Sequence, residues 1–299
     1  MIIDINHLMQ AKSPSAILGS MSHLRDDVDP RTTIRTRMNS SVDPNMVKPY
    51  CWMCSTNEGK KTNEHIFSIS LRRLAEHNEF DSHRVNAITG EGYDKRNLQK
   101  LNSLLAGNVC ASCNNGWMNK LEITVTPQII DVPNRVLTSQ EVQFWIRWIA
   151  KISVMINTSQ NYRVQWKASQ RHYLQYGLPA NMHVFVARVE DGTKYDVNWM
   201  QSIGHELLCD CGEIQPHLAE MQEFSLCNVI RIFDLCFVVV LTPPNFKIRL
   251  NHRWGIDLFP LFANGTLRTT NLWDLESIKD YVGEEVLYKI ANSFELVER

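Results

Sequence analysis

Apolar residues fall into two spacings along the chain, and most of them lie in its C-terminal half. Residues 140–157 carry valine, isoleucine and tryptophan at helical spacing, with Thr138 or Ser139 as a cap and Glu141 in the first turn. This pattern predicts a strongly apolar helix. Shorter apolar runs bounded by turn residues predict strands at 162–167, 182–189, 195–201, 225–233, 235–242 and 246–250.

Two further signals complete the C-terminal half. Asp191-Gly192 predicts a hairpin between two of the strands. Residues 274–291 predict a closing helix that is interrupted near Gly283. Strands and helices in this order indicate an α+β fold with a mostly antiparallel sheet. No run of about 18 apolar residues occurs, so no membrane span is expected, and the N-terminus lacks the basic start of a signal peptide.

The N-terminal part is less periodic. Residues 1–47 mix basic and acidic residues with Ser, Thr and Pro, which favours a partly extended arm on the protein over a basic arm along a phosphate backbone. Four segments follow: a knuckle and β-hairpin at 48–65, a helix at 68–77 capped by Ser70, a poorly patterned insertion at 78–109, and a knuckle leading into a helix from Cys110 to Glu122.

Two CxxC pairs predict a metal site. Cys51 and Cys54 form the first pair, and Cys110 and Cys113 form the second. Each two-residue spacer lets both sulfurs face one ion, and four thiolates complete a tetrahedral zinc site with no open position, so the zinc is expected to be structural. The alternative is four unrelated buried thiols. Paired CxxC motifs favour a metal site in a reducing compartment, which predicts a cytoplasmic location.

An adjacent acid and histidine lie between the two pairs. Glu64 offers an oxygen ligand for a hard divalent ion, and His65 offers a neutral imidazole that can deprotonate water. In a regular strand the two side chains point to opposite faces, so the strand end must bend for them to converge. Asn114 directly follows the last cysteine and is a second candidate oxygen ligand, with Asn115 as the alternative.

The order CxxC, Asn63-Glu-His-Ile-Phe67 and Cys110-Ala-Ser-Cys-Asn-Asn-Gly-Trp117 is similar to the HNH endonuclease family. The resemblance covers residues 51–122. It implies a ββα-metal core on a treble-clef zinc site and metal-dependent hydrolysis of DNA in a bacterial or phage setting, such as anti-phage defence or mobile-element biology. The cofactors that it implies are structural Zn²⁺ and catalytic Mg²⁺ or Mn²⁺.

The resemblance also implies a role for each matched residue. Glu64 becomes a ligand of the catalytic ion, His65 the general base, and Asn114 the final metal-binding residue, where histidine is common in the family. The middle asparagine of the motif is open, and its candidates are Asn97, Asn102 and Asn108. Arg72 and Arg73 are candidate phosphate contacts, and a solvated helix face is the alternative.

A second group of candidate ligands lies further along the chain. It consists of His205, Cys209, Cys211 and His217. A C-x-C pair on a strand puts both sulfurs on one face, but this spacing is less typical of zinc than CxxC, so we favour a strand and turn without metal. Cys227 and Cys236 alternate with apolar residues and are expected in the core.

Charge and length limit the remaining choices. The net charge is −1, with a surplus of three positive charges over residues 48–120 and of four negative charges over 121–299. This distribution permits nucleic-acid binding without demanding it. We expect an arm at 1–47, a nuclease core at 48–125 and an α+β domain at 126–299 that binds substrate, a protein partner or a second copy. The alternatives are a non-catalytic zinc module and an RNA-directed nuclease.

Overall fold

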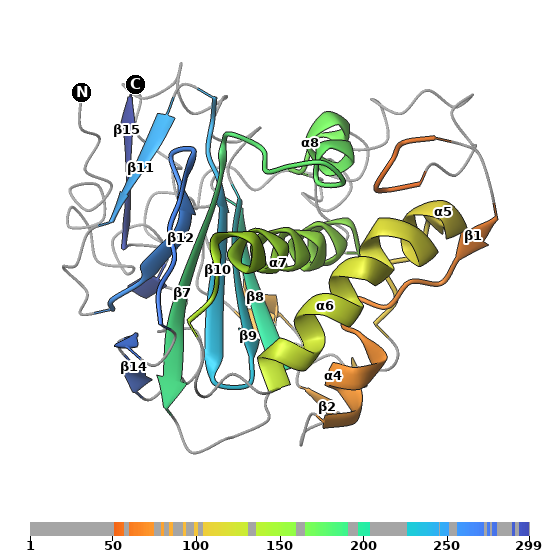
Figure 1. The fold of residues 1–299 in the computed structure, drawn as a ribbon, viewed down its shortest axis with the longest axis horizontal. Coiled ribbons are helices and arrows are strands. Elements are labelled where there is room, and N and C mark those ends of the chain that lie inside the picture. The colour runs from red at the N-terminus through yellow and green to blue at the C-terminus, as the bar shows by residue number, and fades with distance from the viewer. Residues whose placement is uncertain are drawn as a thin grey trace, which may run out of the picture.

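The computed structural model describes the chain from Cys51 onward, with gaps. It covers residues 51–56, 60–74, 79–80, 84–85, 92–93, 99–100, 104–130, 136–159, 165–190, 197–203, 226–244, 246–250, 256–271, 274–275, 277–279, 289–290 and 293–298. The predicted arm at 1–47 and the candidate ligands from His205 to His217 lie outside the described residues. Within them, helices and a largely antiparallel sheet form an α+β fold, as the sequence predicts (Figure 1).

A seven-stranded sheet forms the C-terminal half. Its main path runs β13-β12-β7-β10-β9-β8, with antiparallel neighbours throughout, and β14 pairs in parallel with β7. The strands are β7 (Met182–Glu190), β8 (Val197–Ile203), β9 (Leu226–Ile232), β10 (Leu235–Leu241), β12 (Phe259–Ala263), β13 (Thr266–Leu267) and β14 (Ser277–Lys279).

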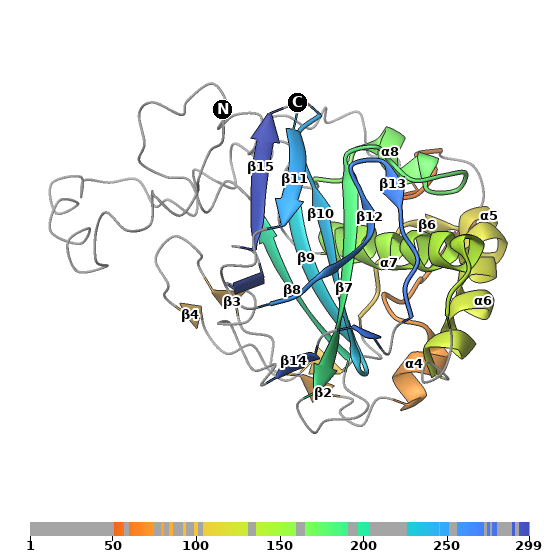
Figure 2. The ribbon, with the colours of Figure 1, turned by 60° about the vertical axis from the view of Figure 1, so that its left-hand side comes forward.

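The central strand β10 is apolar along its whole length because both faces of the sheet are covered. Leu235, Phe237, Val239 and Leu241 belong to one core, and Cys236, Val238 and Val240 belong to another. This two-residue alternation follows from the strand geometry. The second core is closed by β11 (Phe246–Leu250) and β15 (Phe294–Glu298), which pair beside the sheet (Figure 2).

Helix α7 (Ser139–Ser159) covers the other face of the sheet. Thr138 caps it, since its hydroxyl accepts from the Glu141 N–H at 3.3 Å and the Glu141 carboxylate accepts from the Thr138 N–H at 2.9 Å. Trp145 packs against Phe237 of β10 with ring centroids 6.1 Å apart. Helix α6 (Asn119–Ile130) packs on α7 away from the sheet, so α7 is buried on both sides (Figure 1).

The N-terminal part is a small antiparallel ribbon followed by a helix. Strand β1 (Lys61–Thr62) pairs with β6 (Val109–Cys110), and the chain then enters α5 (Ala111–Cys113), the π-helical turn η2 (Asn114–Met118) and α6. Between the two strands lie α4 (Ile69–Leu74) and two short antiparallel pairs, β2 (Glu79–Phe80) with β5 (Gln99–Lys100) and β3 (Arg84–Val85) with β4 (Gly92–Tyr93).

Several local predictions are wrong. The predicted hairpin at Asp191-Gly192 does not exist as a strand pair, because β8 pairs with β9 and β7 pairs with β10 and β12. The hairpin is instead β9–β10, where Phe233 turns the chain with φ 57°. Within the predicted helix 274–291, residues 277–279 form β14, because pairing with β7 outweighs local helical spacing.

Two further predictions are corrected near the ends of elements. The knuckle at Cys51 does not form a hairpin with the following strand, because that strand pairs with β6 across the long insertion. The helix predicted at 68–77 is α4, and the Ser68 hydroxyl, not Ser70, accepts a hydrogen bond in its first turn, from the Leu71 N–H. The described part of the predicted strand 162–167, residues 165–167, is not a strand and leads instead into helix α8 (Ala168–Tyr173), which was not predicted.

Among the described residues, no helix is both long and apolar enough to cross a membrane. Helix α7 is long enough in residues, but Glu141, Arg147 and Lys151 interrupt its apolar surface. One of these charges, on Lys151, is central to the candidate site described below.

Candidate functional site

The ribbon around β1 and β6 contains one extra residue that bends it. Lys61 and Thr62 pair with Cys110 and Val109, and His65 then bridges to Leu105. Two residues lie between Thr62 and His65 on the first strand, whereas three residues lie between Leu105 and Val109 on the second strand. The extra length falls at Gly107 and Asn108, which have φ of 60° and 37°. The bulge therefore lies opposite the segment between Thr62 and His65, which contains Glu64, and a bulge of this kind bends its strand and increases the local twist of the ribbon.

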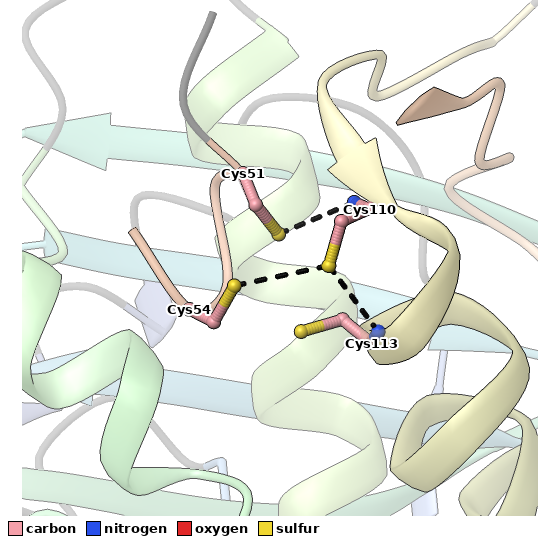
Figure 3. Close-up of side chains that lie close together, drawn as sticks. All are labelled: Cys51, Cys54, Cys110 and Cys113. Atoms are coloured by element: carbon pink, nitrogen blue, oxygen red, sulfur yellow. Dashed lines mark hydrogen bonds between the residues drawn. The ribbon is translucent and has the colours of Figure 1, made fainter. Parts of the chain in front are cut away.

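Four cysteines converge at the end of this ribbon. Cys51 and Cys54 come from the turn at the start of the described chain, and Cys110 and Cys113 come from β6 and α5 (Figure 3). Their sulfurs all lie within 4.8 Å of one another, and those of Cys54 and Cys110 are 3.8 Å apart. Tetrahedral zinc with Zn–S bonds of about 2.3 Å requires sulfurs about 3.8 Å apart. The cluster could therefore hold a metal ion such as zinc.

Two of the sulfurs also accept hydrogen bonds from backbone N–H groups. The Cys110 N–H donates to Cys51 Sγ at 3.3 Å, and the Cys113 N–H donates to Cys110 Sγ at 3.4 Å. A hydrogen bond from the Cys113 thiol lowers the pKa of Cys51, and the same bond raises the pKa of Cys113. All described cysteines are free thiols, so no disulfide among them competes for these sulfurs.

Helix α8 supports the first pair of cysteines from outside. Arg171 donates from Nη1 to the Trp52 carbonyl at 2.6 Å, and its guanidinium lies 5.3 Å from the centre of the Trp52 ring. Arg147 of α7 in turn holds the end of α8 by donating to the carbonyls of Leu174 and Gln175. The turn that carries Cys51 and Cys54 is thereby tied to α7.

Glu64 and His65 lie on the ribbon beyond the bulge. The Glu64 carbonyl accepts from the Ala106 N–H at 2.8 Å, which fixes the backbone of the pair. His65 is half-buried, and its Nδ1 is buried without a hydrogen-bond partner among the described residues. Burial, followed by the charge of Arg72, lowers the pKa of His65, so the imidazole is neutral at pH 7.

A buried lysine joins Glu64 to a second acid. Lys151 of α7 is fully buried, and its Nζ lies 3.1 Å from Glu64 Oε1 and 2.5 Å from Glu122 Oε1 of α6. Burial lowers the pKa of Lys151, but the charges of Glu122 and Glu64 outweigh burial, so its pKa is raised and the amine stays protonated. We call Glu64, Lys151 and Glu122 the ionic bridge.

Asn114 lies at the first turn of the helical segment, against the ribbon. Its Nδ2 donates to the Thr62 hydroxyl at 2.9 Å, and the Thr62 hydroxyl donates to the Val109 carbonyl at 3.0 Å. Asn114 Oδ1 makes no hydrogen bond to any described residue and is the end of the amide that remains open to a ligand. No hydrogen bond joins Asn114 to Glu64 or His65 within the described part of the chain.

The remaining candidate residues occupy different environments. Arg72 is buried and donates from Nε to the Phe67 carbonyl at 3.1 Å, whereas Arg73 is exposed. Of the candidates for the middle asparagine, only Asn108 is described. It lies at the bulge, where its side chain accepts from Lys61 and its carbonyl accepts from the Trp52 N–H, so it braces the cysteine end of the ribbon.

Sequence reasoning did not identify Lys151 or Glu122. A signal existed, because Lys151 is the one charge within the apolar run from Trp148 to Ile156. A lysine inside such a run is rarely fully buried unless it is paired. Its partners are 87 and 29 residues away in sequence, so the pattern could not name them.

We expect Lys151→Met to lower the free energy of unfolding by about 3–5 kcal/mol, because it leaves two acids without the buried cation that neutralises them. Urea unfolding followed by circular dichroism measures the change. Lys247→Met is the matched control: Lys247 is exposed on β11, so its effect should stay within about 0.5 kcal/mol. Equal stability of the two variants would contradict the ionic bridge.

Comparison with known proteins identified no relative of this chain. No protein-family model, no curated protein and no solved structure gives a significant match to the chain.

Proposed function

We propose that the chain is a metal-dependent endonuclease of the HNH type that hydrolyses phosphodiester bonds of DNA. The observation that carries the proposal is the bent ribbon running into a helix, with Glu64 and His65 on its first strand and four cysteines at its end. This order matches the resemblance drawn from the sequence. The cysteine cluster would hold structural zinc, and the acid–histidine pair would carry the chemistry.

The residues divide the reaction between them. His65, neutral at pH 7, accepts a proton from the attacking water. Glu64 has one carboxylate oxygen paired with Lys151, and its Oε2 makes no hydrogen bond to a described residue, so Oε2 and Asn114 Oδ1 are the oxygens that would bind Mg²⁺ or Mn²⁺. A bound ion of this kind stabilises the charge that develops on the phosphoryl group and on the leaving 3′ oxygen.

A second function is favoured by the ionic bridge itself. The charge of Glu64 is neutralised by Lys151 without any metal ion, as expected of an acid with a structural role. A non-catalytic zinc module that binds nucleic acid or protein would have this property. A non-catalytic module does not require a neutral histidine whose Nδ1 is buried without a hydrogen-bond partner among the described residues. We therefore prefer the nuclease over the non-catalytic module.

We expect the zinc-loaded, full-length protein to nick or linearise supercoiled plasmid in Mg²⁺ or Mn²⁺ and to stop in EDTA. Glu64→Gln, prepared in parallel, should lose most of the activity because an amide is a weaker ligand than a carboxylate. A contaminating nuclease would act equally in both preparations. A second arm with single-stranded RNA distinguishes the RNA-directed alternative, and failure on both substrates would leave the non-catalytic module.

A further inference from the structure

The ionic bridge is asymmetric. Glu122 uses both of its oxygens: Oε1 contacts Lys151, and Oε2 accepts from the Thr126 hydroxyl at 3.2 Å. Glu64 uses one oxygen for Lys151 and has no described hydrogen bond at the other. Thr126 and Glu122 lie one turn apart on α6, so they form a fixed anchor for the ammonium group. The acid with an open oxygen is the one adjacent to His65.

We infer that Lys151 and Glu122 are positioning residues that hold the Glu64 carboxylate in the orientation in which its free oxygen binds a divalent cation. This inference rests on the proposed function for the role of Glu64. Lys151 acts through Glu64 and touches no reacting atom. Glu122 acts one step further away by fixing the ammonium group from α6.

The geometry around Glu64 indicates that Lys151 orients the carboxylate and does not only balance its charge. The backbone of Glu64 is held at its carbonyl by Ala106, and its side chain is held at Oε1 by Lys151. Lys151 reaches it from the middle of a helix that is buried against the sheet, where Ser153 bonds to Asn228 at 2.7 Å. With both ends fixed, Glu64 presents Oε2 in one direction. Fixed orientation of a ligand by an outer partner is worth about 10–100-fold in metal affinity.

Charge and orientation predict opposite effects at Lys151. A cation beside a metal ligand repels the metal, so Lys151→Met should tighten metal binding if Lys151 acts by charge alone. If Lys151 orients Glu64, the same substitution should weaken binding. Lys151→Arg keeps the charge and changes the shape of the donor, so it too should weaken binding if orientation is the role.

The test is Mn²⁺ binding to the zinc-loaded, full-length protein, followed by the electron paramagnetic resonance signal of the free ion. Lys151→Met, Lys151→Arg and Glu122→Gln are measured alone and combined with Glu64→Gln, with Lys247→Met as the matched control. Circular dichroism and zinc content identify variants that have not folded. If Lys151→Met fails to fold, Lys151→Arg and Glu122→Gln carry the test, because both retain polar partners in the bridge.

We expect each bridge variant to weaken Mn²⁺ binding by about 10–100-fold when Glu64 is present and by less than about 3-fold in the Glu64→Gln background. Equal weakening in both backgrounds, tighter binding in Lys151→Met, or no Mn²⁺ binding by the unsubstituted protein would overturn the inference. Binding that follows the expected pattern without plasmid or RNA cleavage would reject the proposed nuclease and leave the positioning role supported.

Discussion

Cys113→Ser is expected to lower the zinc content of the purified protein and to unfold the N-terminal ribbon. A structural zinc site contributes about 10–16 kcal/mol of apparent folding free energy, which is comparable to the whole stability of a typical domain. Cys113 is buried, and its sulfur lies within 4.8 Å of the other three sulfurs, so a serine oxygen cannot replace it without breaking the tetrahedron. Zinc content by mass spectrometry and a thermal melt measure both effects.

The loss should spread beyond the ribbon. Cys51, Cys110 and Cys113 belong to the same hydrophobic core as Trp145 of α7 and Phe237 of the sheet. Cys227→Ser is the matched control, because Cys227 lies on β9 outside the cluster and should leave the zinc content unchanged. Full zinc and an unshifted melting curve for Cys113→Ser would contradict the four-cysteine metal site.

His65→Ala is expected to reduce plasmid cleavage by about 10²–10⁴-fold, the usual contribution of a general base. The fold should survive, because the Nδ1 of His65 has no hydrogen-bond partner among the described residues and the ring is only half-buried. Truncating such a side chain breaks no described hydrogen bond. Initial rates of plasmid nicking at saturating Mg²⁺, together with zinc content and melting temperature, give the comparison.

His172→Ala provides the control for this result. His172 is an exposed histidine on α8 that contacts the Tyr176 ring and lies outside the ribbon. The His172→Ala protein should cleave plasmid at the rate of the unsubstituted protein. A folded His65→Ala protein that cleaves equally fast would remove His65 from the mechanism and return the acid–histidine pair to a structural role.

The elements with strong periodic patterns were predictable. The helix predicted at 140–157 is α7, and the predicted strand 246–250 has the bounds of β11. Their apolar residues form patterns that only one secondary structure can bury. Helix α8 was missed because Ala168–Tyr173 has little apolar periodicity and is held by tertiary contacts, such as the Arg171 bond to Trp52. Strand β14 was missed because its pairing with a distant strand sets its conformation.

The candidate site was predictable only in its local parts. CxxC spacing identifies cysteines that face one ion, and the structure brings all four together. The ionic bridge depends on three separate elements, and no spacing rule connects Glu64, Glu122 and Lys151. The bulge at Gly107 and Asn108 likewise depends on pairing across a long insertion, which the sequence does not reveal.

The position of α7 also limits how the chain could be recombined in evolution or by engineering. Helix α7 supplies the cation of the ionic bridge to the ribbon and, on its other side, Ser153 and Trp145 to the sheet. A fragment ending after α6 would keep every residue of the CxxC and Glu-His motifs and still lack the ammonium group between Glu64 and Glu122. The segment that must be transferred as one unit is therefore larger than the motif. A fusion protein or a domain transplant must include α7 and the sheet on which α7 packs.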